Sequence, residues 1–192
     1  YFVASWQTGL RSYDVSDPEN PVELDHLPEV SHNENEDLAT NGKILLLSKF
    51  NRADPVNHLA VIDVSDPKDM KVISTLPGAG SHTMECLYDC KWAYGSGSKQ
   101  ASDGIIVDLR NPAKPKLVEA KWTDATNGGG GHDVTEVSPG IVLTSSSPIN
   151  LLDARKDPTR PKVLAVGEMV ELGAVQHSAI WPHQGKSDFL LM

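Results

Sequence analysis

Short apolar runs that end at an aspartate and pass into a polar turn recur along the chain. The clearest is Leu59 to Pro67, LAVIDVSDP, in which the apolar run ends at Asp63 and a Ser-Asp-Pro turn follows. Short runs of this kind, bounded by Asp, Ser and Pro, are typical of β-strands. Three further segments have the same order of strand, aspartate and turn: 10–21 (LRSYDVSDPENP), 105–115 (IIVDLRNPAKP) and 149–161 (INLLDARKDPTRP).

The spacing of this pattern predicts the fold. The repeat aspartates are Asp14, Asp63, Asp108 and Asp153, and they lie 49, 45 and 45 residues apart. A period in this range is typical of four-stranded propeller blades. The sequence therefore predicts an all-β fold, a β-propeller of four-stranded antiparallel blades in a single domain over residues 1–192. About four blades are expected in this chain, as part of a seven-bladed ring.

Each unit predicts four strands, which we label A to D from the central channel outward. They are expected at 1–5, 9–15 and 22–27; at 31–39, 43–48, 58–64 and 71–76; at 82–87, 91–95, 104–109 and 116–122; at 132–137, 141–145, 150–154 and 162–166; and at 176–182 and 189–192. No helix of convincing length is predicted. Since the chain starts and stops at a B strand, we expect open edges that invite pairing with another propeller fragment or chain. A four-bladed ring with overlapping ends is the alternative.

The repeated motif resembles a known family. VIDVSDP and YDVSDPENP look like the repeats of the LVIVD-repeat β-propellers, whereas LLDARKDPTRP has an extra residue and VDLRNPAKP lacks the second Asp. That family is found largely in bacterial exported or surface-associated proteins and has no single agreed activity. The resemblance implies a propeller architecture and export.

Charge narrows the classes of partner. The chain has 17 Lys and Arg against 26 Asp and Glu, for a net charge of -9. An acidic surface repels phosphate groups, so nucleic acid and anionic membranes are not expected as partners. No apolar run approaches the roughly 18 residues that a membrane helix requires. The chain opens on YFVASW without Met or a targeting signal, and we expect that this is not the translated N-terminus.

The two cysteines, Cys86 and Cys90, lie in ECLYDCKW. Three intervening residues between two strands would place the thiols across a tight turn, where a small disulfide can form. A disulfide would indicate an oxidising compartment, and so an extracellular or cell-surface location. Two free thiols in a cytosolic protein, or half of a metal site, are the alternatives.

The repeated Asp-Pro turns are interpreted as structural. Asp accepts backbone N–H groups in a turn, and Pro fixes φ at the next position. Every blade needs this corner, so Asp17, Asp66 and Asp157 are assigned to folding rather than to a site.

Histidine is the second repeated feature. His32, His82, His132 and His177 lie 18, 19, 24 and 24 residues after their repeat aspartates, at the start of each predicted A strand. Imidazoles that converge on the channel could hold zinc, copper or iron, with Glu36, Glu85 and Glu136 as further ligands or hydrogen-bond acceptors. The alternative is structural: a histidine at this position can staple the turn within its own blade.

Long connections are predicted on the same face as the histidines. The D-to-A and B-to-C connections share one face, and they include 49–57, 96–103, 123–131 and 167–175. Irregular loops at a channel mouth often bind ligands. We therefore expect an exported binding or scaffold module that takes a protein or small-molecule ligand at this face, rather than an enzyme. The alternatives are a metal-dependent enzyme, either an oxidoreductase or a hydrolase, and a structural piece that pairs with another chain through open blades.

Overall fold

The described part of the chain forms four antiparallel sheets in sequence order. The computed structural model describes residues 2–6, 8–30, 38–49, 56–96, 104–126, 131–146, 148–167 and 177–191. Blade 1 holds β1 (Phe2–Trp6), β2 (Gly9–Asp14) and β3 (Val22–Leu27), and blade 2 holds β4 (Ala39–Thr40), β5 (Ile44–Lys49), β6 (His58–Asp63) and β7 (Lys71–Pro77). Blade 3 holds β8 (Thr83–Leu87), β9 (Trp92–Ser96), β10 (Ile105–Asp108) and β11 (Lys116–Leu117), and blade 4 holds β12 (Asp133–Ser138), β13 (Ile141–Ser145), β14 (Ile149–Asp153) and β15 (Lys162–Gly167).

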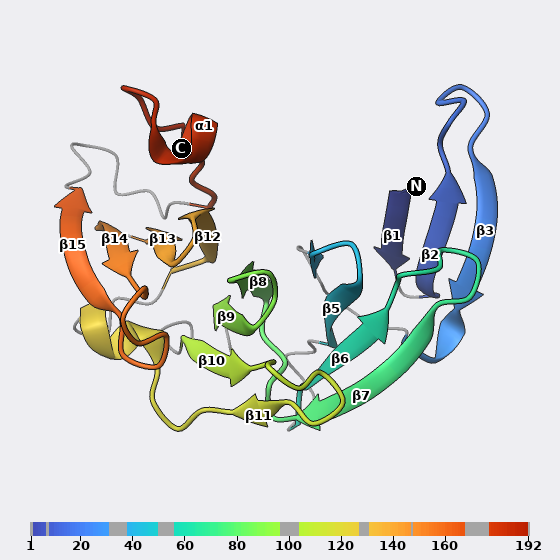
Figure 1. Cartoon of the computed structure of the whole chain (residues 1–192), viewed down its shortest axis with the longest axis horizontal. Helices are drawn as coiled ribbons and strands as arrows, with labels where there is room; N and C mark the ends of the chain where they lie inside the picture. The colour runs from blue at the N-terminus through green and yellow to red at the C-terminus, as the bar shows by residue number, and fades with distance from the viewer. Residues whose placement is uncertain are drawn as a thin grey trace.

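The sheets follow one another around an arc (Figure 1), with β1, β5, β8 and β12 toward its inner side and β3, β7, β11 and β15 toward its outer side. Within each sheet, strands that are consecutive in sequence pair antiparallel. This up-and-down arrangement is that of propeller blades. The predicted all-β fold with four-stranded antiparallel blades is confirmed, with three described strands in blade 1. A ring of seven blades stays a prediction.

The core lies between blades, which explains why some strands are apolar at every position. In β5, Leu45 and Leu47 pack with Leu10 of blade 1, whereas Leu46 packs with Met84 and other residues of blade 3. All of these side chains are at most 1% exposed. A strand buried on both faces requires a continuous apolar run rather than alternation. A third cluster, around Trp122, joins blades 3 and 4 in the same way.

The Asp-Pro corners repeat almost atom for atom. Each repeat aspartate accepts the backbone N–H of the residue two positions later, at Ser16, Ser65, Arg110 and Arg155. The second polar residue of each corner does the same for Glu19, Lys68, Ala113 and Thr159. Asn111 stands at this second position in blade 3, because an amide oxygen accepts the same bond as a carboxylate. These contacts confirm the structural interpretation of Asp17, Asp66 and Asp157.

Each of three corners also joins its blade to the preceding one. The carbonyl oxygens of Pro67, Pro112 and Pro158 accept hydrogen bonds from Ser12 Oγ, Ser74 Oγ and Tyr94 Oη, at 2.5, 2.7 and 2.6 Å. The three donors lie on β2, β7 and β9, which are different strands of their blades. The acceptor is therefore constant while the donor varies.

Three sequence expectations need correction. The D strand expected at 116–122 ends at Leu117, and residues Trp122–Thr126 form a 3₁₀ helix (η2), in which buried Trp122 donates its indole N–H to Gly95 O at 2.9 Å. In place of strands over 176–182 and 189–192, the described residues contain only a bridge between Ile180 and Leu191 and the short α1 (Pro182–Gly185). A further 3₁₀ turn, η1, covers Pro28–Val30. No described helix is long and apolar enough to cross a membrane.

Candidate functional site

Two of the four predicted histidines stand at the same place in consecutive blades. His82 and His132 directly precede β8 and β12, the innermost strands of blades 3 and 4. The backbone N–H of His82 donates to Ser96 O at 3.0 Å, and that of His132 donates to Ser145 O at 2.8 Å. The same bond thus fixes each histidine against the end of the neighbouring B strand. His32 and Glu36 lie outside the described residues.

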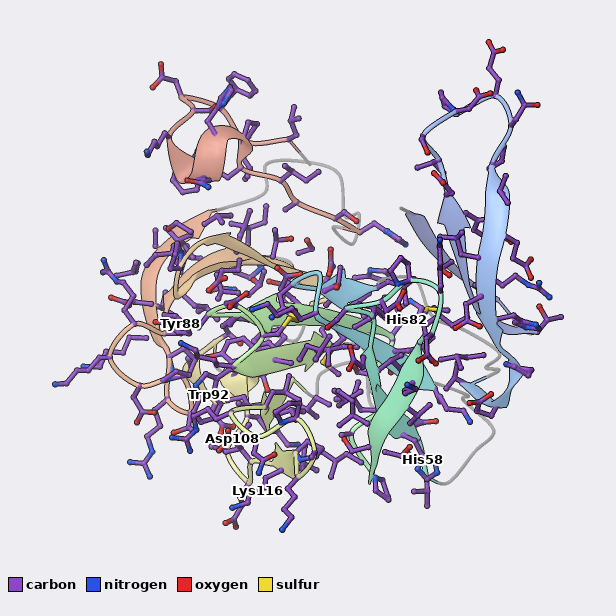
Figure 2. All side chains as sticks on the ribbon, turned by 45° about the vertical axis from the view of Figure 1, so that its right-hand side comes forward. His58, His82, Tyr88, Trp92, Asp108 and Lys116 are labelled. Carbon is purple, nitrogen blue, oxygen red and sulfur yellow. A yellow bond between two sulfur atoms is a disulfide. The ribbon has the colours of Figure 1, made fainter. Side chains whose placement is uncertain are left out.

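The rings of three histidines gather at this place. His82 Nε2 lies 3.0 Å from His132 Nε2, with the ring planes at 89° and the centroids 4.7 Å apart. The His177 ring stacks on that of His132, with centroids 3.7 Å apart and a tilt of 31°. In Figure 2, His82 lies on the opposite side of the view from Tyr88 and Trp92, which belong to the A–B turn and B strand of the same blade.

Ser96 holds both histidines of the pair. Its carbonyl oxygen accepts the N–H of His82, and its hydroxyl donates to the carbonyl oxygen of His132 at 2.7 Å. Thr83 Oγ1 lies 2.9 Å from the same His132 carbonyl and 2.8 Å from Ser96 Oγ, so the two hydroxyl hydrogens are shared among three contacts. Ser96 and Thr83 are 1% and 3% exposed. Buried polar groups of Ser96 and Thr83 therefore tie together the main chain at two histidines that come from different blades.

Sequence reasoning missed these serines. Each described B strand of blades 2 to 4 has a serine near its end, at Ser48, Ser96 and Ser145. Ser48 Oγ donates to Ser81 O in blade 3, just as Ser96 reaches blade 4. The Ser145 hydroxyl is buried without a hydrogen-bond partner. These serines stand 15, 12 and 8 residues before the repeat aspartates, so alignment on the repeat does not bring them together, and only their place near the end of each B strand is shared.

A cavity of about 370 Å³ lies beside the histidines. Thr83 and Glu85 of β8, His132 beside β12, Asp133 and Thr135 of β12, and His177 contribute to its wall. Two carboxyl groups, two imidazoles and several hydroxyls therefore face one space. Positions 83 and 85, like 133 and 135, point to the same side because side chains alternate along a strand. This alternation is why the inner strands present polar groups to the channel while Met84 and Val134 enter the core.

The structure separates the two predicted glutamates. Glu85 lies on the cavity wall, and its Oε1 accepts the backbone N–H of Glu136 at 3.2 Å. The Glu136 carboxylate accepts the N–H groups of Gly140 at 2.7 Å and Tyr88 at 3.1 Å, at the A–B turns of blades 4 and 3. Burial raises the pKa of Glu136 above its ordinary value, against the lowering effect of these N–H groups. Among the described residues, no three His, Cys, Asp or Glu side chains are arranged to hold a metal ion.

The predicted disulfide is present. Cys86 and Cys90 are bonded across the A–B turn of blade 3, with Cα atoms 4.5 Å apart. Tyr88, Asp89 and Cys90 have φ of 53°, 59° and 55°, a left-handed run that costs energy in residues other than glycine. The turn contacts both neighbouring blades, because Asp89 O accepts Asn41 Nδ2 at 3.1 Å and the Tyr88 N–H donates to Glu136. The disulfide thus closes a turn that joins three blades.

Comparison with known proteins identifies the repeat. A family model described as the LVIVD repeat matches residues 53–76, which include β6 and most of β7. This segment is similar to one LVIVD repeat. The match covers the C strand, Asp-Pro corner and D strand of blade 2, and LVIVD repeats form propellers, in agreement with the four blades. No curated protein matches the chain.

Proposed function

We propose that this chain is a binding module that takes a small cationic group, either a free amine or a side chain of a partner protein, at the inner ends of blades 3 and 4. The cavity of about 370 Å³ beside His132 and His177 carries this proposal. Its volume lies within the roughly 300–1,000 Å³ typical of small-molecule pockets. Propellers commonly use such a channel face for recognition because rigid strands position side chains around it.

The charge around the cavity favours a cation. Glu85 and Asp133 both contribute to its wall, and the chain as a whole carries a net charge of -9. Carboxylates at the wall of a partly enclosed space attract ammonium or guanidinium groups, and hydroxyls such as that of Thr135 accept their remaining hydrogen bonds. A phosphate or carboxylate ligand would meet repulsion from the same groups.

Export is part of the proposal. The Cys86–Cys90 disulfide supports it, because such bonds persist in oxidising compartments and are rare in the cytosol. A thiol count on protein purified from its own cells, denatured without reductant and with thiols blocked during lysis, tests the location. Fewer than about 0.2 free thiols per chain is expected, and two free thiols would contradict export.

A binding titration tests the function. Lysine, arginine and putrescine are the cationic probes and succinate is the anionic control, with a chelator present and binding followed by calorimetry. At least one cationic probe should bind one-to-one, and Thr135→Trp should abolish that binding by filling the cavity. Leu164→Trp, on the exposed face of β15, is the matched control and should bind normally. No binding by any cationic probe, or equal binding by Thr135→Trp, would contradict the proposal.

Blade 4 favours a second candidate, association with a further propeller blade of another chain. Along β15, Val163, Leu164 and Val166 are 37%, 50% and 53% exposed, and an adjoining apolar pocket is lined by Leu151, Ala165 and Phe189. A blade from another chain would cover these residues. Light scattering across a concentration series should show association, and Leu164→Glu should abolish it. A monomer at every concentration would contradict this candidate.

A further inference from the structure

We propose that His82 and His132 form a two-imidazole site for one borderline divalent transition-metal ion, such as zinc, and that Ser96 is its positioning residue. The proposal rests on the binding function above, since the ion would be the cation held beside the cavity. The observation that carries it is the 3.0 Å separation of the two Nε2 atoms, which face each other across the boundary between blades 3 and 4.

The separation fits two ligands of one ion. Imidazole nitrogens bind zinc at about 2.0–2.1 Å, so two of them at ligand angles between right-angled and tetrahedral lie about 2.9–3.4 Å apart. The observed 3.0 Å lies at the right-angled end of this range. The nearly perpendicular rings allow both lone pairs to reach the same point without a clash of ring edges. An N–H···N hydrogen bond between two neutral rings gives a similar distance and is the competing explanation.

The surroundings favour a cation over that hydrogen bond alone. Asp133 adjoins His132 in the chain, and it contributes with Glu85 to the wall of the neighbouring cavity. Two carboxylates stabilise a dipositive ion beside the imidazole pair by charge attraction. Imidazole is a good ligand for zinc, copper, nickel and iron, whereas calcium and magnesium prefer oxygen ligands only. With two protein nitrogens the ion keeps open positions, which water or a small ligand in the cavity would fill.

The pair is held in place before any ion arrives. His82 and His132 belong to different blades, so their separation depends on contacts across the blade boundary. Ser96 supplies two of these, through its carbonyl to His82 and its hydroxyl to His132, and both of its polar groups are buried. Groups that support metal ligands typically affect affinity by about 10- to 100-fold. His177 stacks on the His132 ring and is itself exposed, so we expect it to orient that ring rather than to carry the site.

Metal titration of the tag-free full chain tests the site. The protein is stripped with chelator and dialysed, and zinc and cobalt(II) binding are then measured by calorimetry, with the absorption spectrum of cobalt as a second readout. We expect one equivalent of binding in the wild type. His82→Ala and His132→Ala should each weaken it by more than about 100-fold, more than the loss of a supporting group costs. His26→Ala, on β3 of blade 1, is the matched control and should bind as the wild type does.

Two serine variants test the positioning role. Ser96→Ala removes the hydroxyl that holds His132 and should weaken zinc binding by about tenfold with a changed cobalt spectrum, whereas Ser96→Thr should restore both. Ser145→Ala is the matched control, because its hydroxyl is buried at the equivalent place without a partner. A merely structural role for Ser96 would lower stability and leave the cobalt spectrum unchanged, and that result would contradict the positioning role.

The outcomes separate this proposal from the binding function. Wild-type protein that binds no metal, or a His82→Ala/His132→Ala double variant that binds it as tightly as the wild type, would overturn the site and leave the pair as an ordinary hydrogen bond. The amine titration, done with chelator present, is unaffected by that result. A cavity that binds amines without metal would therefore keep the proposed function while rejecting the metal site.

Discussion

The Asp-Pro corners and the histidine positions are both repeated, but they differ in what their side chains contact. In each corner the carboxylate bonds to backbone N–H groups of its own turn, and the side chain remains near solvent. His82 and His132 instead contact each other across a blade boundary, beside a cavity. Repetition alone therefore marks the period of the fold. Convergence of the repeated side chains on one space marks a candidate site.

The ion pairs of the corners make the same distinction. Arg110 and Arg155 each form an ion pair with the repeat aspartate of their own corner. The Nη2 atom lies 2.7 Å from Oδ2 of Asp108 in the first pair and of Asp153 in the second. The arginine side chains are 65% and 59% exposed. Such exposed pairs contribute little to stability. Substitution of a corner residue should consequently act mainly through the turn hydrogen bonds, and charge should contribute a smaller share.

The largest expected effect is on the disulfide turn. Replacing Cys86 and Cys90 together by Ser should lower the free energy of unfolding by about 2 kcal/mol, because the short closed loop no longer restricts the unfolded chain. Urea unfolding of the variant and the wild type measures this difference. Reduction of the wild type with dithiothreitol should give the same loss. No change in either experiment would show that the left-handed turn is held by its contacts with the neighbouring blades alone.

The next effect tests whether the corners are structural. Asp66→Ala should cost about 1 kcal/mol, since the N–H of Lys68 loses its acceptor. Asp66→Asn should cost close to nothing, because Asn111 already fills this position in blade 3. Urea unfolding distinguishes the two. Equal losses for Ala and Asn would show that charge, rather than the turn hydrogen bond, is what the corner needs.

Acid should weaken the corners. Arg155 and its backbone N–H lower the pKa of Asp153 from 3.8 to about 2, and the Ser65 N–H and hydroxyl lower that of Asp63. Because the folded-state pKa lies below the unfolded one, the stabilisation is complete above the unfolded pKa and disappears as the pH falls through the folded pKa. The midpoint temperature of thermal unfolding should thus decrease as the pH is lowered from about 4 to about 2. Asp153→Asn should flatten this fall, and an unchanged slope would contradict the assignment.

The smallest effect is expected at the histidines' exposed edge. His177→Ala should change the free energy of unfolding by no more than about 0.5 kcal/mol, because the residue is exposed. Thermal unfolding of the metal-free protein measures it. A loss above 1 kcal/mol would show that His177 stabilises the fold, as the Asp-Pro corners do, and would contradict its assignment to the candidate site.

Much of the fold was predictable because the repeat gives the length of a blade and the position of each strand within it. Once Asp63 fixes the phase, strand alternation places the remaining strands, and the tight turn at Cys86 and Cys90 follows. Trp122 shows where this reasoning stops: its run resembles a strand, but burial of the large ring against Gly95 selects a 3₁₀ turn. That choice depends on a contact between distant segments, which no local pattern contains.

The candidate site was predictable only in outline. Because His82 and His132 hold similar positions in the repeat, the sequence could place both at the inner strands. The distance between their rings, however, depends on the twist between blades and on Ser96. Glu136 illustrates the limit. Counting residues from His132 makes it resemble a ligand, but four residues of strand carry it about 13 Å along the blade. There it caps the A–B turn instead.

The proline carbonyls at the Asp-Pro corners have a consequence for how such proteins change over generations. In blades 2 to 4, a main-chain oxygen of the Asp-Pro corner accepts a hydrogen bond from the preceding blade. The donor is a serine or a tyrosine, and it lies on a different strand in each case. Main-chain atoms survive every substitution of the side chain. The donor can therefore move from one strand to another as the sequence changes, and this hydrogen bond between blades is kept.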